Sequence, residues 1–406
     1  MRILFLSTWF PYPPSQGSKL RAYYLLKALA QKHQVALVSY EDVPLEPAWV
    51  DHMRQLCPLV KILPRQPFAA DRVKTWQGWL SLWPSAVIAI RSPEMAELVS
   101  RTAREWEPEC VVALTFVTAP YALELTKTPK VVDIDNLMAR MLYETYLAEH
   151  SPLTRLRRWL AYKKFERYEK WLYRPFDVSL AVTPADQQSA CDLLGLKPER
   201  VAVVSNGVDT TANPFRMVEP VPNTLVFNGA LTYQANFDAM DHFMRDILPQ
   251  ICEQVPEVQI SITGKTDGVP LDQLPVNGHV KFTGFLQDIR PAVAGSWVCV
   301  VPLRIGGGTR LKVLEAMSLG TPVVSTRKGA EGLDVESGKH LLIADAPQEF
   351  AAQVVRLLRE PELRDYLARN AVQLVREKYE WAQIGEQFCK VVENLVPAPG
   401  MARNAA

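Results

Sequence analysis

The stretch PLRIGGGTRLKVLEAMSLGTPVVST, residues 302–326, combines three consecutive glycines, two cations that follow them and an apolar pattern of helical period that ends at another glycine. Gly306, Gly307 and Gly308 have no Cβ, so their backbone can pass very close to a bound group. A helix is expected to begin near Thr309 and to direct its free amide groups and its positive dipole end at that group. The stretch therefore predicts a binding site for an anion.

Three side chains of the same stretch extend this predicted site. Arg310 and Lys312 supply positive charge for phosphate oxygens. Glu315 supplies a carboxylate that can accept hydrogen bonds from a pair of sugar hydroxyls. The alternative is a glycine turn followed by surface cations and a capping glutamate, but it leaves three successive glycines unexplained. We therefore favour a combined site for a phosphate group and a sugar.

The composition is that of a globular protein with two domains. The chain has 406 residues, of which 48% are hydrophobic and 22% charged, and this length exceeds one comfortable core. With 45 basic and 44 acidic side chains, the net charge gives no support for a nucleic-acid partner. The six cysteines are scattered without metal-binding spacing, and no apolar run is long enough for a transmembrane helix. We expect a cytoplasmic protein.

Short apolar runs alternate with segments of helical period along the whole chain. Continuous apolar runs of this kind are typical of strands buried on both faces of a parallel sheet. The runs are 2–8, 34–40, 110–116, 130–135, 177–183 and 201–207 in the first half, and 224–230, 258–264, 280–285, 297–303, 321–326 and 340–345 in the second. A polar segment with prolines, 213–223, lies between the two sets. The pattern predicts an α/β protein with two Rossmann-like, doubly wound domains.

The loop after the first predicted strand is a second candidate site, because ligands of doubly wound sheets lie beyond the carboxyl ends of the strands. Gly17 and the amide groups of Ser18 and Lys19 stand at the start of a predicted helix, where they could bind an anion. Equally, Ser18 could cap the helix while Gly17 makes the turn. The residues favour neither interpretation.

Five motifs give the chain a family resemblance. GGGTRLKVLEAMSLGTPVVST resembles the donor-binding signature of the retaining glycosyltransferases of family 4, also called glycosyl transferases group 1, which have the GT-B fold. The other four motifs agree with that family in order and spacing: PPSQGSKLRAYYLLKAL near the start, VVSNGVD (203–209), FNGALTYQANFDAM (227–240) and GFLQDIRPAVAGSWVCVVPL (284–303). The order of the five is more specific than any one of them.

The resemblance implies two domains that face a cleft. Residues 1–207 would bind the acceptor, residues 208–377 the nucleotide-sugar donor, and residues 378–396 would form a helix that crosses back to the first domain. The implied activity is that of a metal-independent hexosyltransferase. It would move a sugar from a UDP- or GDP-linked donor to a sugar or lipid-linked glycan in polysaccharide or glycan assembly, with retention of the anomeric configuration.

The resemblance also assigns roles by position. Glu315 would hold the nucleotide ribose, Arg310 and Lys312 would neutralise the departing diphosphate, and Gly229 would lie beneath it. Gly17 and Ser18 would complete the phosphate site. Glu331 is a further candidate contact for the sugar or nucleotide because of its own position, after the strand predicted at 321–326. Fixed cations and amide groups would supply the main catalytic stabilisation, so neither a metal nor another cofactor is expected.

The segment VVDIDN (131–136) carries two further candidates, Asp133 and Asp135. Their spacing matches a metal-binding Asp-x-Asp pair, but the GT-B resemblance argues against a metal. Members of the family often have a histidine at the end of this strand, where this chain has Asp135. Our hypothesis is that Asp135 orients the acceptor hydroxyl or the transferred sugar, with Asp133 in support. Equally, Asp135 or Asn136 could cap the helix that follows.

Two departures from the family pattern leave other functions open. Gly307 stands where the family commonly has a glutamate that contacts the transferred sugar, and Ala230, Ala235 or Asn236 stand where many members have cations. One alternative is a nucleotide-sugar epimerase on the same scaffold, although no histidine lies in a suitable motif. The other is a non-catalytic component that binds a sugar nucleotide within a glycan assembly complex.

Two segments suggest peripheral contact with the inner surface of a membrane. Residues 154–176 interleave cations with aromatic residues, as in helices that lie on anionic lipid. We favour slightly the alternative that the aromatic residues pack into the first domain while the cations stay in water. Trp76, Trp79 and Trp83 of a second segment, 73–87, could line an acceptor groove or touch the membrane.

Overall fold

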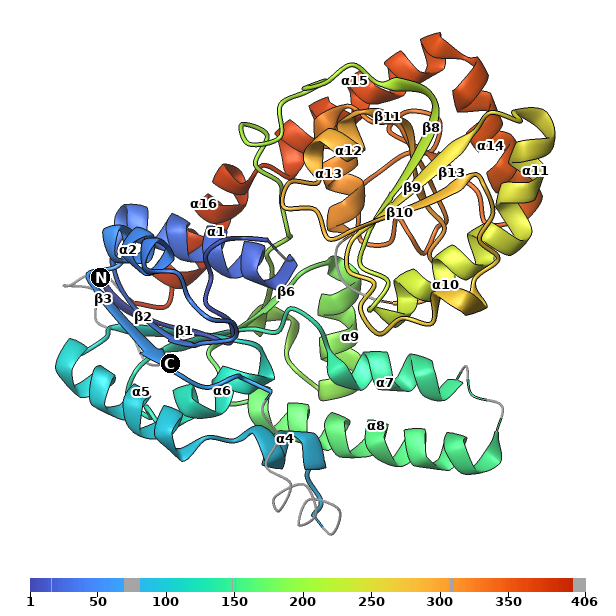
Figure 1. Ribbon diagram of the computed structural model, residues 1–406. Coiled ribbons are helices and arrows are strands. Elements are labelled where there is room, and N and C mark those ends of the chain that lie inside the picture. Colours follow the sequence, from blue (N-terminus) through green and yellow to red (C-terminus); the bar gives the residue numbers. More distant parts are fainter. Residues whose placement is uncertain (16, 69–80, 148, 150, 307–309, 397–406) are drawn as a thin grey trace. The chain divides into compact units, whose positions relative to one another are not determined.

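The computed structural model describes residues 1–406 apart from 16, 69–80, 148, 150, 307–309 and 397–406. The chain divides into two compact units (Figure 1). Unit 1 is Met1–Ser205 with the described residues from Ile384 onward, and unit 2 is Asn206–Gln383. Within the described ranges, no helix is both long and apolar enough to cross a membrane.

Unit 1 is built on a parallel sheet of seven strands in the order β3-β2-β1-β4-β5-β6-β7. The strands are β1 (Arg2–Ser7), β2 (Gln34–Tyr40), β3 (Leu59–Leu63), β4 (Cys110–Leu114), β5 (Lys130–Asp133), β6 (Val178–Ala181) and β7 (Val201–Val203). Its helices are α1 (Gly17–Lys32), α2 (Pro47–Leu56), α4 (Ser85–Ile90), α5 (Pro93–Trp106), α6 (Thr115–Leu123), α7 (Met138–Leu147), α8 (Pro152–Tyr173) and α9 (Pro184–Leu194).

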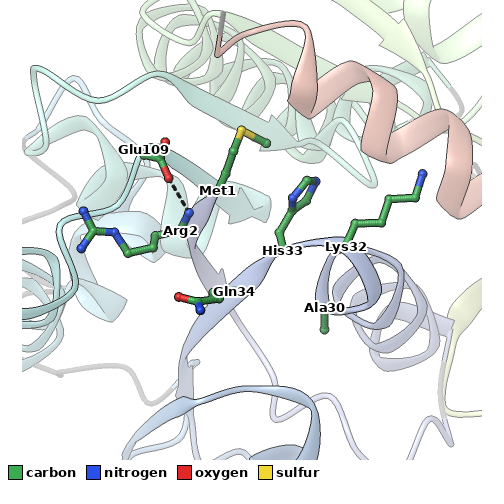
Figure 2. A pocket seen from close by; sticks show the side chains of 7 residues that line it. All are labelled: Met1, Arg2, Ala30, Lys32, His33, Gln34 and Glu109. Carbon is green, nitrogen blue, oxygen red and sulfur yellow. Dashed lines mark hydrogen bonds between the residues drawn. The ribbon is translucent and has the colours of Figure 1, made fainter. Parts of the chain in front are cut away.

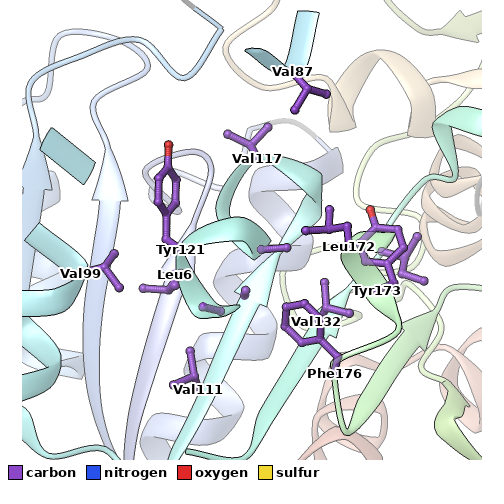
Figure 3. Close-up of a cluster of buried hydrophobic side chains, with 14 of the residues drawn as sticks. Leu6, Val87, Val99, Val111, Val117, Tyr121, Val132, Leu172, Tyr173 and Phe176 are labelled. Atoms are coloured by element: carbon purple, nitrogen blue, oxygen red, sulfur yellow. The ribbon is translucent and has the colours of Figure 1, made fainter. Parts of the chain in front are cut away.

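The strands β1, β2 and β4 of unit 1 are buried on both sides, as continuous apolar runs require. On one side of the sheet, side chains of β1, β4 and β5 meet those of α5, α6 and α8. Figure 3 shows this core, in which Leu6, Val111 and Val132 of the sheet lie among Val99, Tyr121 and Leu172 of the helices. The fully buried strands leave polar side chains to the ends of the sheet.

Unit 2 has a parallel sheet of six strands in the order β10-β9-β8-β11-β12-β13. The strands are β8 (Val221–Asn228), β9 (Gln259–Thr263), β10 (Val280–Gly284), β11 (Ser296–Val301), β12 (Val323–Ser325) and β13 (Leu342–Ile343). The helices are α10 (Gln234–His242), α11 (Leu248–Gln254), α12 (Arg290–Ala294), α13 (Leu311–Leu319), α14 (Pro347–Arg359) and α15 (Pro361–Lys378). A π-helical turn, Phe243–Ile247, joins α10 to α11.

The last helix, α16 (Trp381–Glu393), begins in unit 2, and from Ile384 its residues belong to unit 1. It packs closely on α1, because a Cβ placed on Gly385 would come within 2.6 Å of the Cβ of Ala28. Lys32 and His33 at the end of α1 hold it through Glu386 and Glu393, at 2.8 and 3.0 Å. Unit 1 is thus made from both ends of the chain.

The predicted α/β class with two Rossmann-like sheets is confirmed, and each of the twelve predicted runs overlaps a strand. One strand was missed. β3, LVKIL, lies at the edge of the sheet, is only partly buried, and carries Lys61 at its centre. An edge strand needs no continuous apolar run, so the search for such runs did not detect it.

Candidate active site

In unit 2 the polar residues gather at the point where the strand order reverses. The connections from β8 and β11, which are neighbours in the sheet, run in opposite directions along it. Gly229 directly follows β8, and Gly306 and Arg310 follow β11 before α13 begins. Such a switch point leaves a crevice outside the carboxyl ends of the strands, where ligands of doubly wound sheets bind.

Lys312 is held at this point by uncharged groups. Its Nζ donates to Asn236 Oδ1 at 2.7 Å and lies 4.1 Å from the centre of the Phe227 ring. A Cβ on Gly229 would come within 2.7 Å of the same Nζ, so a side chain at this position would displace the ammonium group from its place. Burial lowers the pKa of Lys312 to about 7. Among the described residues, no carboxylate forms an ion pair with this lysine.

Glu315 lies one turn further along α13 and is fixed by Asn228. The side-chain amide of Asn228 donates to Glu315 Oε2 at 2.8 Å and to the carbonyl oxygen of Lys312 at 3.2 Å. Burial raises the pKa of Glu315. One strand-end asparagine therefore orients both the carboxylate and the first turn of the helix.

Arg310 is turned back on its own loop. Its guanidinium donates to the carbonyl oxygen of Gly306 at 2.7 Å and lies 3.5 Å from a carboxylate oxygen of Glu331, which also pairs with Lys328 at 2.7 Å. α13 begins at Leu311, two residues later than predicted. Of the predicted glycine loop, Gly307, Gly308 and Thr309 lie outside the described residues.

Unit 1 carries its polar cluster at the carboxyl ends of β1 and β5. Asp135 follows β5 in a left-handed conformation, φ 54°, which aspartate adopts more readily than most residues. The hydroxyl of Ser18, in the first turn of α1, donates to Asp135 Oδ2 at 3.1 Å. Burial raises the pKa of Asp135 to about 6, and the carboxylate of Asp133 acts in the same direction. Ser18 and Asp135 are thus brought together.

Asp133, which was predicted to support Asp135, forms an ion pair with Arg21 through both of its carboxylate oxygens. Arg21 of α1 donates from Nε and Nη2 to the two oxygens of Asp133, both at 2.7 Å, and the pair is almost completely buried. Its Nη1 donates to the carbonyl oxygens of Val204 and Ser205 at 2.9 and 3.3 Å. Arg21 therefore joins α1, the end of β5 and the last residues of unit 1 before the chain enters unit 2.

Comparison with known families gives a match in each of the two units. The family model described as Glycosyltransferase Family 4 matches residues 16–212, and the model described as Glycosyl transferases group 1 matches residues 222–360. The chain belongs to the GT-B glycosyltransferases of the family 4 type. It is therefore an enzyme of the glycosyltransferase class, as its motifs imply.

A glycogen synthase of Mycobacterium tuberculosis is 23% identical to this glycosyltransferase over 417 residues, which cover 96% of the chain and 94% of the relative. Sucrose-phosphate synthase from Thermosynechococcus elongatus superposes with a TM-score of 0.70 at 16% identity, over 97% and 99% of the two chains. HepE of Anabaena, solved in complex with UDP and glucose, superposes with a TM-score of 0.65 at 17% identity, over 97% and 100%. The two structures support the GT-B fold.

The glycosyltransferase has a buried glutamate that sequence reasoning missed. Glu169 of α8 accepts hydrogen bonds from the backbone amides of Met138 and Ala139, at 3.0 and 2.9 Å, and so caps α7. Burial raises its pKa to about 7. The interpretation of Asp135 as the cap of this helix is therefore wrong, because Glu169 takes that place. The fixed start of α7 holds the loop that carries Asp135.

The first helix of the glycosyltransferase also differs in detail from the expected anion site. The side chain of Lys19 points to Asp42 after β2, at 2.7 Å, and is buried there. The hydroxyl of Ser18 is directed to Asp135. Gly17 is exposed at the start of α1. Asn228, Asn236 and Phe227 were likewise not predicted to take part in the site, although all three lie within the motif FNGALTYQAN, in which only the expected cations had been sought.

A cavity of about 420 Å³ lies in unit 1 beside the amino-terminal ends of the strands, away from the candidate site at their carboxyl ends (Figure 2). It is lined by Met1, Arg2, Ala30, Lys32, His33, Gln34 and Glu109. These residues stand at the amino ends of β1, β2 and β4, where doubly wound sheets do not bind their ligands. Among the described residues, no group of three acidic, histidine or cysteine side chains is placed to hold a metal ion.

We predict that Arg21→Met lowers the free energy of unfolding by about 3–5 kcal/mol, because it leaves the carboxylate of Asp133 buried without a counter-ion. Thermal and urea unfolding would measure the loss. The exposed pair of Arg54 and Asp51 in the same unit provides the control, and Arg54→Met should cost less than about 1 kcal/mol. Arg21→Met with Asp133→Leu should recover most of the loss; equal effects of the two single arginine variants would contradict the assignment.

Proposed function

We propose that this glycosyltransferase moves a sugar from a nucleoside diphosphate to a hydroxyl group with retention of anomeric configuration. The observation that carries the proposal is Lys312, a lysine held by an amide and an aromatic ring beside a glycine at the switch point of unit 2. A diphosphate would supply the negative charge that this lysine does not find in the described residues.

The other residues of unit 2 fit the remainder of the donor. Glu315, oriented by Asn228, would accept hydrogen bonds from the ribose hydroxyls. Arg310 would stabilise the charge that develops on the leaving diphosphate, which Gly229 lets approach Lys312 closely. Glu331 and the loop of Gly306, Gly307, Gly308 and Thr309 are proposed contacts of the donor. With these cations in place of a metal, we propose that transfer proceeds without a metal cofactor.

Unit 1 would bind the acceptor. Asp135, held by Ser18, is proposed to orient the acceptor hydroxyl or the transferred sugar, and Gly17 and Ser18 to contact the diphosphate. UDP is the first nucleotide to test, because the similar HepE structure was solved in complex with UDP. We propose a sugar or lipid-linked glycan as acceptor, in the assembly of a polysaccharide, with peripheral contact at the inner membrane surface.

We predict that UDP or GDP raises the melting temperature of the wild type and that Glu315→Gln removes most of this effect. A ligand at about 100 times its Kd stabilises the folded state by about 2.7 kcal/mol. Loss of a hydrogen bond to a charged group costs about 1.5–3 kcal/mol, or about ten- to a hundredfold in affinity. A thermal-shift screen with UDP, GDP, ADP and CMP would measure both.

Glu336→Gln is the control for this screen, because Glu336 is an exposed glutamate of unit 2 that pairs with Lys339. It should keep the full effect of the nucleotide. A shift that Glu315→Gln leaves unchanged would contradict the ribose assignment. The absence of a shift with all four nucleotides would contradict the donor site itself.

We predict that UDP binds more weakly as the pH rises above about 7, by up to about tenfold per pH unit. Free Lys312 loses its proton near this pH, whereas a bound diphosphate favours the charged form, so binding takes up a proton. Titration calorimetry between about pH 7 and 9 in buffers of different ionisation enthalpy would measure the uptake. Lys312→Arg stays charged throughout and should show a flat profile; the same slope in both proteins would contradict the role of Lys312.

We predict opposite effects of Asp135→Asn on activity and on stability. The pKa of Asp135 is raised in the folded state, so ionisation of this group costs stability as the pH rises through about 6. Above this pH Asp135→Asn should melt at a higher temperature than the wild type. If the carboxylate orients a reacting hydroxyl, kcat of the wild type should rise through about pH 6, and the variant should be slow at every pH. Full turnover in the variant would contradict the role.

A further inference from the structure

Helix α8 has apolar side chains on two opposite sides. Its inner side packs into unit 1 and carries the buried residues Tyr162, Phe165, Tyr168, Leu172 and Tyr173. Glu169 on the same side caps α7. The predicted packing of the aromatic residues into the first domain is therefore confirmed for the four aromatic residues among these five, but Trp159 and Trp171 are exposed and the packing does not account for the rest of the helix.

The outer side of α8 exposes leucines. Leu153, Leu156 and Leu160 are spaced by three and four residues and so lie on one side of the helix, with 79%, 54% and 46% of their surfaces exposed. Trp171 continues the same line after a further three turns and is 49% exposed. Four large apolar side chains in one line are more than the isolated exposed residues that a soluble surface normally carries.

Among the described residues, the exposed apolar side chains are concentrated on helices α7 and α8. Seventeen large apolar side chains are exposed, and eight of them belong to α7 and α8: Met141, Tyr143, Leu147, Leu153, Leu156, Trp159, Leu160 and Trp171. The two helices run side by side as a hairpin (Figure 1). The other nine are distributed over the rest of the two units.

The charge along this outer side has one sign. Residues 151–165 contain five cations and no acid. Arg157 and Arg167 lie in the same line as the leucines, because Arg157 is three residues from Leu160 and Arg167 is three residues from Lys164, which itself follows Leu160 by four. In the described part of the chain, neither arginine takes part in an ion pair. A partner that matches this surface therefore needs both apolar groups for the leucines and negative charge for the arginines.

We propose that the outer face of α8, from Leu153 to Trp171, lies in the interface of a bilayer that contains anionic phospholipid. The leucines and Trp171 enter the region between head groups and acyl chains, and Arg157, Lys164 and Arg167 contact lipid phosphates. The long side chains of the cations allow this, because they extend from the apolar interface to the charged head groups. The inference gives the proposed peripheral contact a surface and a lipid class, and it rests on that part of the proposed function.

A second copy of the chain fits this face less well. In a two-fold dimer the same surface lies on both partners, so cations of one α8 would face cations of the other. No acid between residues 151 and 165 is present to compensate. A bilayer with anionic lipid offers an apolar region to the leucines and, next to it, phosphates to the cations.

The test is flotation of the full chain with vesicles of phosphatidylcholine, with or without phosphatidylglycerol. The wild type should float only with the anionic vesicles, and salt should weaken the binding. Leu156→Ser with Leu160→Ser should weaken it at least about tenfold through lost apolar burial, and Arg157→Gln with Arg167→Gln at least about tenfold through lost charge. Val276→Ser with Tyr366→Ser, which removes two exposed apolar side chains of unit 2, should leave flotation unchanged.

The outcomes separate this proposal from the others. Equal flotation of all four proteins, or none by the wild type, would overturn it. Self-association of the wild type that Leu156→Ser with Leu160→Ser abolishes, without flotation, would also overturn it in favour of a dimer. The UDP-induced rise in melting temperature, measured on the same preparations, should be the same in all four. Loss of the UDP-induced rise in all four proteins would contradict the proposed donor site and would not affect the interpretation of the flotation result.

Discussion

The guanidinium of Arg21 and the carboxylate of Asp133 meet in the interior of unit 1, where each is 2% exposed. Two charges are removed from water here only because both carboxylate oxygens and the carbonyl oxygens of Val204 and Ser205 accept hydrogen bonds from one side chain. The position of Asp135, two residues beyond this pair, follows from it. So does the course of the chain as it leaves unit 1.

The buried cation Lys312 of unit 2 differs from Arg21 in that it forms no ion pair within the described residues. Lys312 has an amide oxygen and an aromatic face as its contacts, and burial lowers its pKa by more than the carboxylate of Glu315, which forms no ion pair with it, raises it. A saturated cation such as Arg21 holds the fold together and has no capacity left for a ligand. A lysine with neutral partners gains its counter-charge only from a bound anion. The contrast supports the proposed phosphate site in unit 2 on physical grounds that do not depend on any motif.

The fold could be predicted from the sequence because buried parallel strands require continuous apolar runs, and this requirement is local. The edge strand β3 escaped because the requirement is relaxed there. The candidate site was predicted where a residue type has a direct chemical meaning, as for Lys312, Glu315 and Asp135. It was missed where the meaning depends on a distant partner. Glu169 lies 30 or more residues from the amides it binds, and Arg21 lies 112 residues from Asp133.

Helix α8 shows why periodicity alone gave an incomplete account of its surface. An amphipathic helix with one apolar side produces a clear period, and the aromatic residues of α8 satisfy that expectation by packing inward. A second apolar line on the opposite side cancels much of the signal, because the two lines differ by half a turn. Only the exposed fractions of Leu153, Leu156 and Leu160 separate the lines. A helix that already has a buried side gains nothing for the stability of unit 1 from leucines in water, so the outer line has to be explained by what it binds.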